Sequence, residues 1–174
     1  MQVNKLVYVD ETSINTGMTR LYGRAPGNER VVDYTPDVRL ERTALLSSVR
    51  ADGTMVPLIF EGTLNGELFV KYITECLAPA LKPGDTVIMD NLSSHKVAGV
   101  LEPIIAAGAN VRYLPPYSPD MNPIESMWAK IKAYLRKVKA RTKKALEQAL
   151  GEALDTISRT DISAWANDCG YSIQ

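Results

Sequence analysis

Three acidic residues that lie far apart in the sequence have the types and positions to do chemistry together. Asp10 and Asp90 each end a short apolar run that is typical of a buried strand, at residues 6–10 and 86–90. If the two strands are parallel neighbours, the two carboxylates project side by side from adjacent strand ends, where the functional groups of α/β sheets collect. Carboxylates this close raise each other's pKa unless a cation lies between them, and Mg²⁺ prefers such oxygen ligands.

Glu125 is the third acid of this set, with 34 residues between it and Asp90. It falls in the first turn of a helix expected from about Ile124, where the helix dipole favours a carboxylate. Three acids on separate elements can hold two metal ions about 3.5–4 Å apart for an in-line displacement at phosphorus. Each acid alone is more typical of a turn, a helix cap or a first-turn charge. Together, and with the basic segment described below, they favour a metal site.

The elements that must position these acids follow from the hydrophobic pattern. Strands are expected at 6–10, 43–49, 55–60, 86–90 and 110–114, and Asp52-Gly53 predicts a hairpin between the second and third. Helices are expected from residue 65 to Pro79, over 95–107 with a break or kink at Pro103, from about 124, and over a last segment that carries Leu146, Leu150, Leu154 and Ile157. This order predicts an α/β fold in which a mixed five-stranded sheet, three antiparallel strands followed by parallel βαβ units, is flanked by helices.

The charge of the chain is balanced overall but not along the sequence. Of its 174 residues 20 are basic and 20 acidic, yet residues 130–144 hold eight basic residues and no acidic one. A charged helix face is usually only solvated, but a run of one sign departs from the alternating surface pattern and favours contact with DNA phosphates. The expected DNA-binding residues lie in two rows of one helix beside the apolar stripe of Trp128, Ile131, Leu135 and Val138: Lys132, Arg136, Lys139 and Lys143 in one, and Lys130, Lys137, Arg141 and Lys144 in the other.

Length and composition exclude several other classes of protein. A chain of this length is expected to form one domain, residues 1–174, with C-terminal helices from about 143. The longest run without a charged residue is nine, at 103–111, whereas a membrane span needs about 18 or more. The two cysteines form no CxxC pair, which argues against a zinc knuckle or a redox motif. We therefore expect a cytoplasmic, nucleoid-associated protein with no membrane contact and no small-molecule cofactor.

Three further residues are candidates for supporting the acidic site. Asn91 and His95 follow Asp90, and His95, the only histidine, can contact either an aspartate or phosphate near the metal ions or make a purely structural hydrogen bond. Asn122 is expected to cap the helix of Glu125, because asparagine is a preferred cap and the following proline suits the first helical position.

The sequence resembles the DDE transposases of the Tc/mariner superfamily, and most closely their bacterial insertion-sequence branch. The likeness rests on Val-Asp-Glu-Thr at 9–12, on Met-Asp-Asn at 89–91 with His95 beyond it, and on Leu-Pro-Pro-Tyr-Ser-Pro-Asp-Met-Asn-Pro-Ile-Glu at 114–125. It continues through Trp128 to Cys-Gly-Tyr at 169–171, and the spacing from Asp90 to Glu125 is typical of the group.

The resemblance implies a ribonuclease H-like fold in which Asp10, Asp90 and Glu125 are the catalytic residues that bind two Mg²⁺ ions, with Mn²⁺ as a substitute. It also implies nicking of double-stranded DNA at transposon ends and joining of the 3′-hydroxyl to target DNA, usually at TA, by a homodimer. Members of the superfamily carry an N-terminal helix-turn-helix region that this sequence lacks, so the chain resembles the catalytic half alone. Two alternatives remain: a catalytically silent DNA-binding or assembly fragment, and an RNA–DNA hybrid nuclease, which the motif at 114–125 disfavours.

Overall fold

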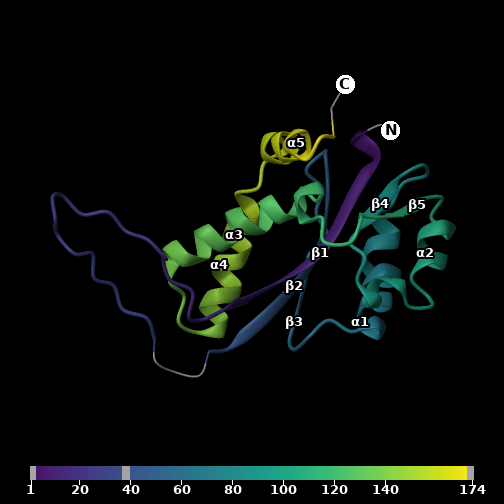
Figure 1. The fold of residues 1–174 in the computed structure, drawn as a ribbon. Helices are drawn as coiled ribbons and strands as arrows, with labels where there is room; N and C mark the ends of the chain where they lie inside the picture. The colour runs from purple at the N-terminus through teal and green to yellow at the C-terminus, as the bar shows by residue number, and fades with distance from the viewer. Residues whose placement is uncertain (1–2, 37–39, 172–174) are drawn as a thin grey trace.

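Five strands form one mixed sheet in the computed structural model, which describes residues 3–36 and 40–171 (Figure 1). The strands are β1 (Leu6–Asn15), β2 (Arg42–Arg50), β3 (Leu58–Phe60), β4 (Thr86–Met89) and β5 (Asn110–Tyr113). Their order is β3-β2-β1-β4-β5; β1, β2 and β3 pair antiparallel, whereas β4 pairs parallel to both β1 and β5. The expected mixed sheet of three antiparallel strands and parallel βαβ units is confirmed.

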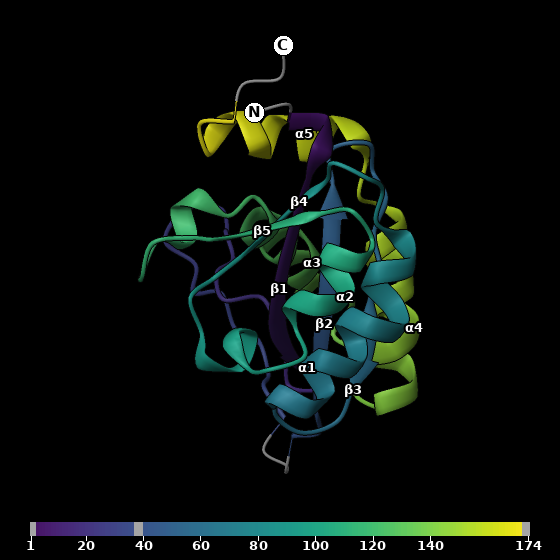
Figure 2. The ribbon, with the colours of Figure 1, turned by 90° about the vertical axis from the view of Figure 1, so that its right-hand side faces the viewer.

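Helices cover both faces of this sheet (Figure 2). They are α1 (Gly66–Tyr72), α2 (Leu101–Ala106), α3 (Ile124–Val138), α4 (Lys143–Asp155) and α5 (Arg159–Asp168). The shorter helical turns are η1 (Val3–Lys5), η2 (Ile73–Leu77), η3 (Ala78–Ala80), η4 (Ser93–Lys96) and η5 (Pro119–Met121). No helix in the described part of the chain is both long and apolar enough to cross a membrane.

Strand β1 divides the core into two parts, because successive side chains of a strand point to opposite faces. Leu6 and Tyr8 pack in the cluster that contains α3, α4 and α5, whereas Val7 and Val9 pack in the cluster that contains α1, η2 and α2. The same alternation directs the next residue, Asp10, towards α3. The core on that face therefore determines which helix lies over the acid.

Several of the expected elements differ from those observed. The strand expected at 55–60 is only β3 at Leu58–Phe60, with an isolated bridge between Met55 and Val49 before it. Strand β1 continues five residues beyond Asp10, because β2 pairs with it as far as Asn15; only the pairing with β4 stops at Val9. The helix expected at 95–107 is instead η4 and α2, separated at Gly99, whose φ of 93° is incompatible with a right-handed helix. Pro103 lies in the first turn of α2, where its missing N–H leaves no hydrogen bond unmade.

The hairpin expected at Asp52-Gly53 is confirmed. Gly53 has a φ of 95°, its N–H donates to the carbonyl of Arg50, and β2 and β3 pair in register from Ala44–Phe60 to Leu46–Leu58. Between β1 and β2 the described residues 18–36 have no regular secondary structure, and this segment, which we call the arm, extends away from the sheet (Figure 1). The Lys139 ammonium, 2.5 Å from the carboxylate of Asp33, ties the arm to the end of α3.

Candidate active site

The parallel pairing of β1 and β4 brings Asp10 and Asp90 to adjacent positions. The register pairs Val9 with Met89, so each aspartate follows one member of the last pair. Glu125 enters from the first turn of α3, and all three acids line one cavity of about 330 Å³. The other lining residues are Asn91, Leu92, Leu114, Pro116, Tyr117, Ser118, Pro119 and Asn122. The sheet edge predicted to collect functional groups thus opens into a cavity.

Asp10 is the most deeply placed of the three acids, with only 8% of its surface exposed. The indole N–H of Trp128, on α3, donates to its Oδ2 at 2.9 Å. Burial raises the pKa of Asp10 to about 7, the hydrogen bond from Trp128 opposes that shift, and the charges of Glu11 and Glu125 add to it. The charged form of Asp10 is therefore penalised in the absence of a nearby cation.

Asp90 is half-buried and is held from the other face of the sheet by the fully buried His95. Nδ1 of the ring lies 2.6 Å from Oδ1 of Asp90, and Nε2 lies 3.4 Å from Oε2 of Glu11. The ring nitrogens lack well-aligned hydrogen-bond partners, so charge attraction, rather than ideal hydrogen-bond geometry, joins the three groups. The ring also stacks on Phe69, with centroids 4.2 Å apart.

The two carboxylates around His95 determine its charge. Burial alone lowers the pKa of His95, but Asp90 and Glu11 outweigh it and raise the pKa to about 9. Burial likewise raises the pKa of Asp90, and the contact with His95 reverses that shift and holds the pKa below its usual value. His95 is therefore a cation near neutral pH and keeps Asp90 ionised. Of the two contacts expected for His95, the one with an aspartate is observed.

The turn before α3 fixes the start of that helix and with it the position of Glu125 in the first helical turn. Asn122 is 3% exposed; its side-chain oxygen accepts the N–H of Ile124 at 3.4 Å and its carbonyl accepts the N–H of Glu125 at 3.1 Å. The expected capping is corrected: the N-cap of α3 is Pro123, with no side-chain capping hydrogen bond, and Asn122 lies one residue earlier, where it holds the turn instead. Burial, with added repulsion from Asp90 and Glu11, raises the pKa of Glu125 against the opposing charge of Lys132.

A tyrosine near the C-terminus braces the same turn. The hydroxyl of Tyr171 donates to the carbonyl of Met121 at 2.9 Å, and its ring meets Tyr8 edge-on with centroids 5.3 Å apart. Tyr8 lies two residues before Asp10 on β1, and Met121 lies immediately before Asn122 in the turn that precedes α3. Tyr171 therefore connects the strand of one acid to the turn that aims another.

The donor set fits divalent cations that prefer oxygen, because three carboxylates from three elements face one cavity. Within the described residues, no three acidic, histidine or cysteine side chains are already gathered closely enough to hold a metal ion. Asn91 adds an amide oxygen that is buried and lacks a hydrogen-bond partner. Binding of a cation would require the carboxylates to turn towards one another, and it would relieve the charge penalty on Asp10 and Glu125.

Sequence reasoning missed Glu11, and it used Trp128 and Tyr171 without assigning them a contact with the site. The period-2 alternation of β1 could have placed Glu11 on the face opposite Asp10. Nothing in the local sequence pairs Trp128 with Asp10, 118 residues away, or Tyr171 with Met121.

The basic segment does not form one helix, so the two expected rows of charge are not formed as predicted. Helix α3 ends at Val138, and Lys139 adopts a left-handed conformation with φ of 56° before Thr142 caps α4. Val138, expected in the buried stripe, is 43% exposed because it lies in the last turn, beyond the core contacts of Leu135.

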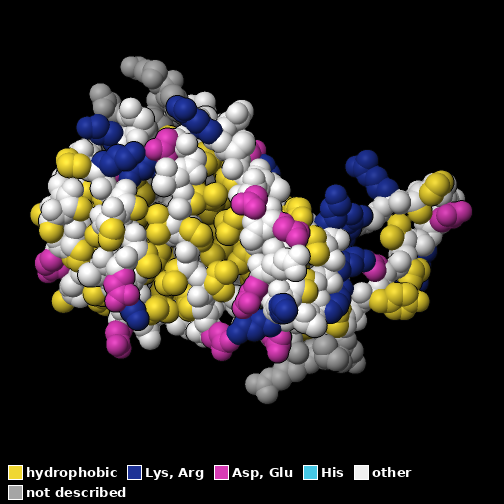
Figure 3. All heavy atoms as spheres, turned by 180° about the vertical axis from the view of Figure 1, so that it is seen from behind, with side chains coloured by type: hydrophobic (Ala, Val, Ile, Leu, Met, Phe, Trp, Pro, Cys, Tyr) yellow, Lys and Arg dark blue, Asp and Glu magenta, His cyan; other side chains and the backbone are white. Residues whose placement is uncertain are grey.

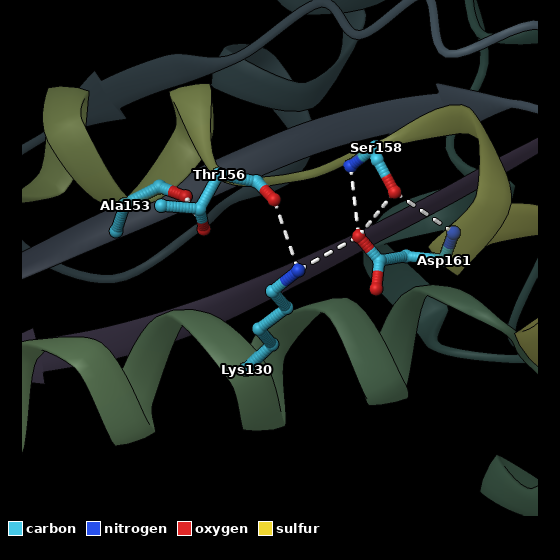
Figure 4. Close-up of polar contacts among 5 residues, drawn as sticks. All are labelled: Lys130, Ala153, Thr156, Ser158 and Asp161. Carbon is cyan, nitrogen blue, oxygen red and sulfur yellow. Dashed lines mark hydrogen bonds and ion pairs between the residues drawn. The ribbon is translucent and has the colours of Figure 1, made fainter.

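The side chain of Lys130 points from α3 towards Thr156 and Asp161 (Figure 4). Its ammonium lies 2.7 Å from Oδ2 of Asp161 and donates to the carbonyl of Thr156 at 2.9 Å. The same carboxylate accepts from the N–H and hydroxyl of Ser158, which caps α5. Lys130 thus joins α3 to the start of α5.

Three more of the eight basic residues also have partners within the protein. Lys139 pairs with Asp33, Lys143 pairs with Glu61, and Arg141 donates to the carbonyl of Thr16 at 2.9 Å. Within the described part of the chain, no ion pair to an acid is found for the other four, Lys132, Arg136, Lys137 and Lys144. From behind, Lys and Arg side chains gather where the arm leaves the body of the protein (Figure 3).

Comparisons with known proteins agree with this geometry. A family described as DDE superfamily endonuclease matches residues 5–147. Among solved structures, the Mos1 transposase paired-end complex with the left transposon end superimposes with a TM-score of 0.77 at 17% identity, over 95% of this chain and 52% of that one. The catalytic domain of Mos1 mariner transposase gives 0.66 at 14% identity, over 97% and 76%. At these identities the structures establish the ribonuclease H-like fold.

A third similar structure, the Mos1 mariner paired-end complex with Mn, has a TM-score of 0.76 at 16% identity, over 97% of this chain and 52% of that one. The chain thus spans about half the length of the transposase chains in the two paired-end complexes. No curated protein matches the sequence.

Proposed function

Because the chain belongs to the family of DDE superfamily endonucleases, we propose that it is a DNA transposase catalytic domain. It would hydrolyse phosphodiesters at transposon ends and join the freed 3′-hydroxyl to target DNA. The observation that carries this proposal is the convergence of Asp10, Asp90 and Glu125 on one cavity. Similarity of fold to Mos1 transposase complexes with transposon-end DNA supports it.

The finer assignments belong to the same proposal. The motif at 114–125 supports membership of the Tc/mariner superfamily, in its bacterial insertion-sequence branch. Residues 1–174 would be a single catalytic domain, and the active complex a homodimer on double-stranded DNA with TA targets in the cytoplasm, associated with the nucleoid. The cofactor would be two Mg²⁺ ions, with Mn²⁺ as a substitute; Mos1 structures with Mg and with Mn support a divalent cation.

Asp10, Asp90 and Glu125 would hold these cations, which when bound activate the attacking oxygen and stabilise the leaving oxygen. The chain's own residues aim the three acids. Trp128 holds Oδ2 of Asp10 and so fixes the carboxylate of this cavity-lining residue. His95 keeps Asp90 ionised, and Asn122 fixes the turn before Glu125. We propose these as supporting roles, together with the unpaired amide oxygen of Asn91.

DNA phosphates would be bound by the basic residues that have no acidic partner among the described residues, Lys132, Arg136, Lys137 and Lys144. Lys132 lies closest in sequence to the acids, two helical turns after Glu125, and its charge already acts on that carboxylate. Lys139, Arg141 and Lys143 contribute only if DNA displaces their present partners. Lys130 has a structural role instead.

A catalytically silent DNA-binding or assembly fragment is the second candidate. It is favoured by one observation: the acids line a cavity without forming a ready-made cluster of ligands among the described residues.

The proposal is tested by incubating supercoiled DNA with the protein and Mg²⁺ or Mn²⁺, beside the Asp90→Ala variant and an Asp168→Ala control. Asp168 is an exposed acid at the end of α5. We expect metal-dependent nicking by the wild type and the control and none by Asp90→Ala. Equal DNA binding with no nicking by any of the three would instead support the silent fragment. Cleavage of an RNA–DNA hybrid in preference to duplex DNA would contradict both.

A further inference from the structure

The segment 115–121, which leads from β5 towards α3, has few ties to the body of the protein. All of its residues except Ser118 are exposed. Within the described part of the chain, its hydrogen bonds join residues of 116–122 to one another, with one exception. The exception is the bond that the Tyr171 hydroxyl donates to the carbonyl of Met121 at 2.9 Å. Among the described residues, a single side chain beyond α5 thus supplies the long-range hydrogen bond of this segment.

That hydrogen bond lies close to Glu125 in the backbone. Met121 is the last residue of η5, where carbonyl groups lack a partner inside the helical turn, and Tyr171 supplies one. The next residue is Asn122, whose own carbonyl accepts the N–H of Glu125 at 3.1 Å. Both Asn122 and Glu125 line the cavity of the three acids, whereas Tyr171 is not among the lining residues. Tyr171 therefore reaches the acid through the turn and does not touch the substrate site.

Tyr171 is itself held in place on two sides. At the end of α5 the N–H of Gly170 donates to the carbonyl of Asn167 at 2.9 Å, and the N–H of Tyr171 donates to the carbonyl of Ala166 at 2.8 Å. Gly170 has a φ of 85°, the left-handed conformation with which such helix ends redirect the chain. The ring of Tyr171 meets that of the fully buried Tyr8 edge-on, with centroids 5.3 Å apart. The hydroxyl is thus delivered to the turn by a fixed side chain.

We propose that Tyr171 is a positioning residue whose hydroxyl holds the turn before α3, so that Glu125 stays in the cavity it shares with the other two acids. The inference rests on the proposed function for the reaction, whereas the order of the turn can be measured without it. If the hydroxyl is removed, the turn gains freedom, and metal binding must then provide the order that the hydrogen bond provides now. Misplacing a catalytic group by about 1 Å can lower a rate by about 10²-fold, so one such bond is enough for a measurable effect.

The first measurement follows the turn itself in metal-free protein. Tyr171→Phe removes the hydroxyl and keeps the ring. The N–H groups of Met121, Asn122 and Glu125 each donate to a backbone carbonyl of the turn, so their hydrogen exchange, followed by NMR, reports its opening. We expect these amides to exchange about three- to tenfold faster in the variant, the range for the loss of one neutral hydrogen bond, and the amides of β1 to exchange as in the wild type.

The second measurement follows the consequence for the site. We expect Tyr171→Phe to bind Mn²⁺ about three- to tenfold more weakly, by the same hydrogen-bond range. The kcat of metal-dependent nicking should fall about tenfold or more, and the KM for DNA should stay unchanged. A hydroxyl that only stabilised the fold would lower the melting temperature and leave the metal affinity and kcat of the folded protein as they are. Metal affinity and kcat therefore distinguish positioning from a purely structural role.

Two variants provide matched controls. Tyr8→Phe removes the other hydroxyl of the aromatic pair, which is buried and lacks a hydrogen-bond partner in the described part of the chain. Asp161→Asn weakens the contact with Lys130 at the opposite end of α5. We expect both to leave turn exchange, Mn²⁺ affinity and nicking unchanged, although Asp161→Asn should slightly lower the melting temperature.

The inference is overturned if the turn amides exchange alike in Tyr171→Phe and the wild type, or if either control changes them as much. It is also overturned if the turn loosens while Mn²⁺ affinity and kcat stay at the wild-type values. Equal nicking by the wild type and Tyr171→Phe removes this inference alone. A loosened turn in the variant, together with a wild type that neither binds Mn²⁺ nor nicks DNA, removes the proposed activity and leaves the placement of Glu125 by Tyr171 in force.

Discussion

Strand β4 has a carboxylate at each end, and the protein treats the two in opposite ways. Asp85, just before the strand, is 2% exposed and fully satisfied: the Arg50 guanidinium lies 2.7 Å from Oδ1, and the N–H of Lys82 donates to Oδ2 at 2.6 Å. Asp90, just after the strand, opens into a cavity that it shares with Asp10 and Glu125. At that end no lysine or arginine among the described residues forms an ion pair with any of the three acids.

The difference separates Asp85, whose charge stabilises the fold, from the acids of the cavity, whose charges remain available to bind a cation. A buried carboxylate with an arginine partner contributes to a specific structure, and removing its partner leaves an uncompensated charge. At the open end Asp90 has the buried His95 as a cationic partner, but Asp10 and Glu125 have no ion pair among the described residues. The charged forms of these two carboxylates therefore cost free energy in the folded state, and a ligand of opposite charge relieves that cost. The same contrast recurs among the cations, between Lys130, which is paired with Asp161, and Lys132, which is not.

The largest effect is expected from removing an acid at the open end. Asp10→Asn keeps an acceptor for Trp128 but removes one of the charges proposed to hold the metal ions. Glu125→Gln likewise removes a charge, in the first turn of α3. We expect each to lower the rate of metal-dependent nicking by about 10³-fold or more, which corresponds to about 4 kcal/mol. Gel assays of supercoiled DNA measure the nicking rate. Nicking at near wild-type rates by either variant would show that the acids at this end of β4 are not needed for catalysis.

The next largest effect is expected on the free energy of unfolding, from a change at Asp85, the acid that is paired with Arg50. Asp85→Ala leaves Arg50 buried without its carboxylate, and such a change typically costs about 3–5 kcal/mol. Urea unfolding should show this loss, while Asp10→Asn and Glu125→Gln leave the free energy of unfolding unchanged or raise it. If Asp10→Asn destabilises the protein as much as Asp85→Ala does, Asp10 is a structural residue and the contrast is wrong.

A smaller effect is expected from pH in metal-free protein with EDTA. The pKa of Asp10 is raised from 3.8 to about 7, so between these values the folded protein binds more protons than the unfolded chain. Its contribution therefore makes stability fall as pH rises from about 4 to 7, by at most about 1.4 kcal/mol per pH unit. The difference between the unfolding curves of the wild type and Asp10→Asn isolates this slope. A slope of the opposite sign would mean that Asp10 has a cationic partner.

The smallest effect concerns the two lysines. Lys132→Ala should weaken DNA binding a few-fold for all sequences and reduce the slope of log affinity against log salt by about 1. Lys130→Ala should leave DNA affinity unchanged and slightly lower thermal stability, because it loses the contact with Asp161. Filter binding over a range of salt concentrations, beside melting curves, separates the two; an equal loss of DNA affinity in both variants would contradict the assignment.

The local pattern of the sequence predicted much of the fold because short-range rules govern it. Short apolar runs predicted β2, β4 and β5, Asp52-Gly53 predicted the hairpin, and the proline-rich segment before Glu125 predicted the start of α3. The length of β1 was wrong because its extension depends on pairing with β2, a partner more than 25 residues away. The second helix was wrong because the left-handed conformation of Gly99 is not visible in hydrophobic periodicity.

The acids of the candidate site could be predicted from their strands and spacing, whereas their supporting contacts could not. Asp10 meets Trp128, and Asp90 and Glu11 meet His95, through packing of elements that are distant in the sequence or lie on opposite faces of a strand. The basic segment was misread for the same reason. Its composition shows the charge, but only the turn at Lys139 and the packing of α5 decide which lysines are already paired.

The central claim, that three acids share divalent cations, is tested most directly by calorimetric titration of Mn²⁺ into the metal-free protein. The comparison needs the wild type, Asp10→Asn, Asp90→Asn and Glu125→Gln, with Asp161→Asn as a control at an acid outside the cavity. The account predicts that the wild type and the control bind Mn²⁺ alike and that each of the other three variants binds at least about tenfold more weakly, a loss of about 1.4 kcal/mol. Binding of Mn²⁺ with unchanged affinity by all three variants would contradict it.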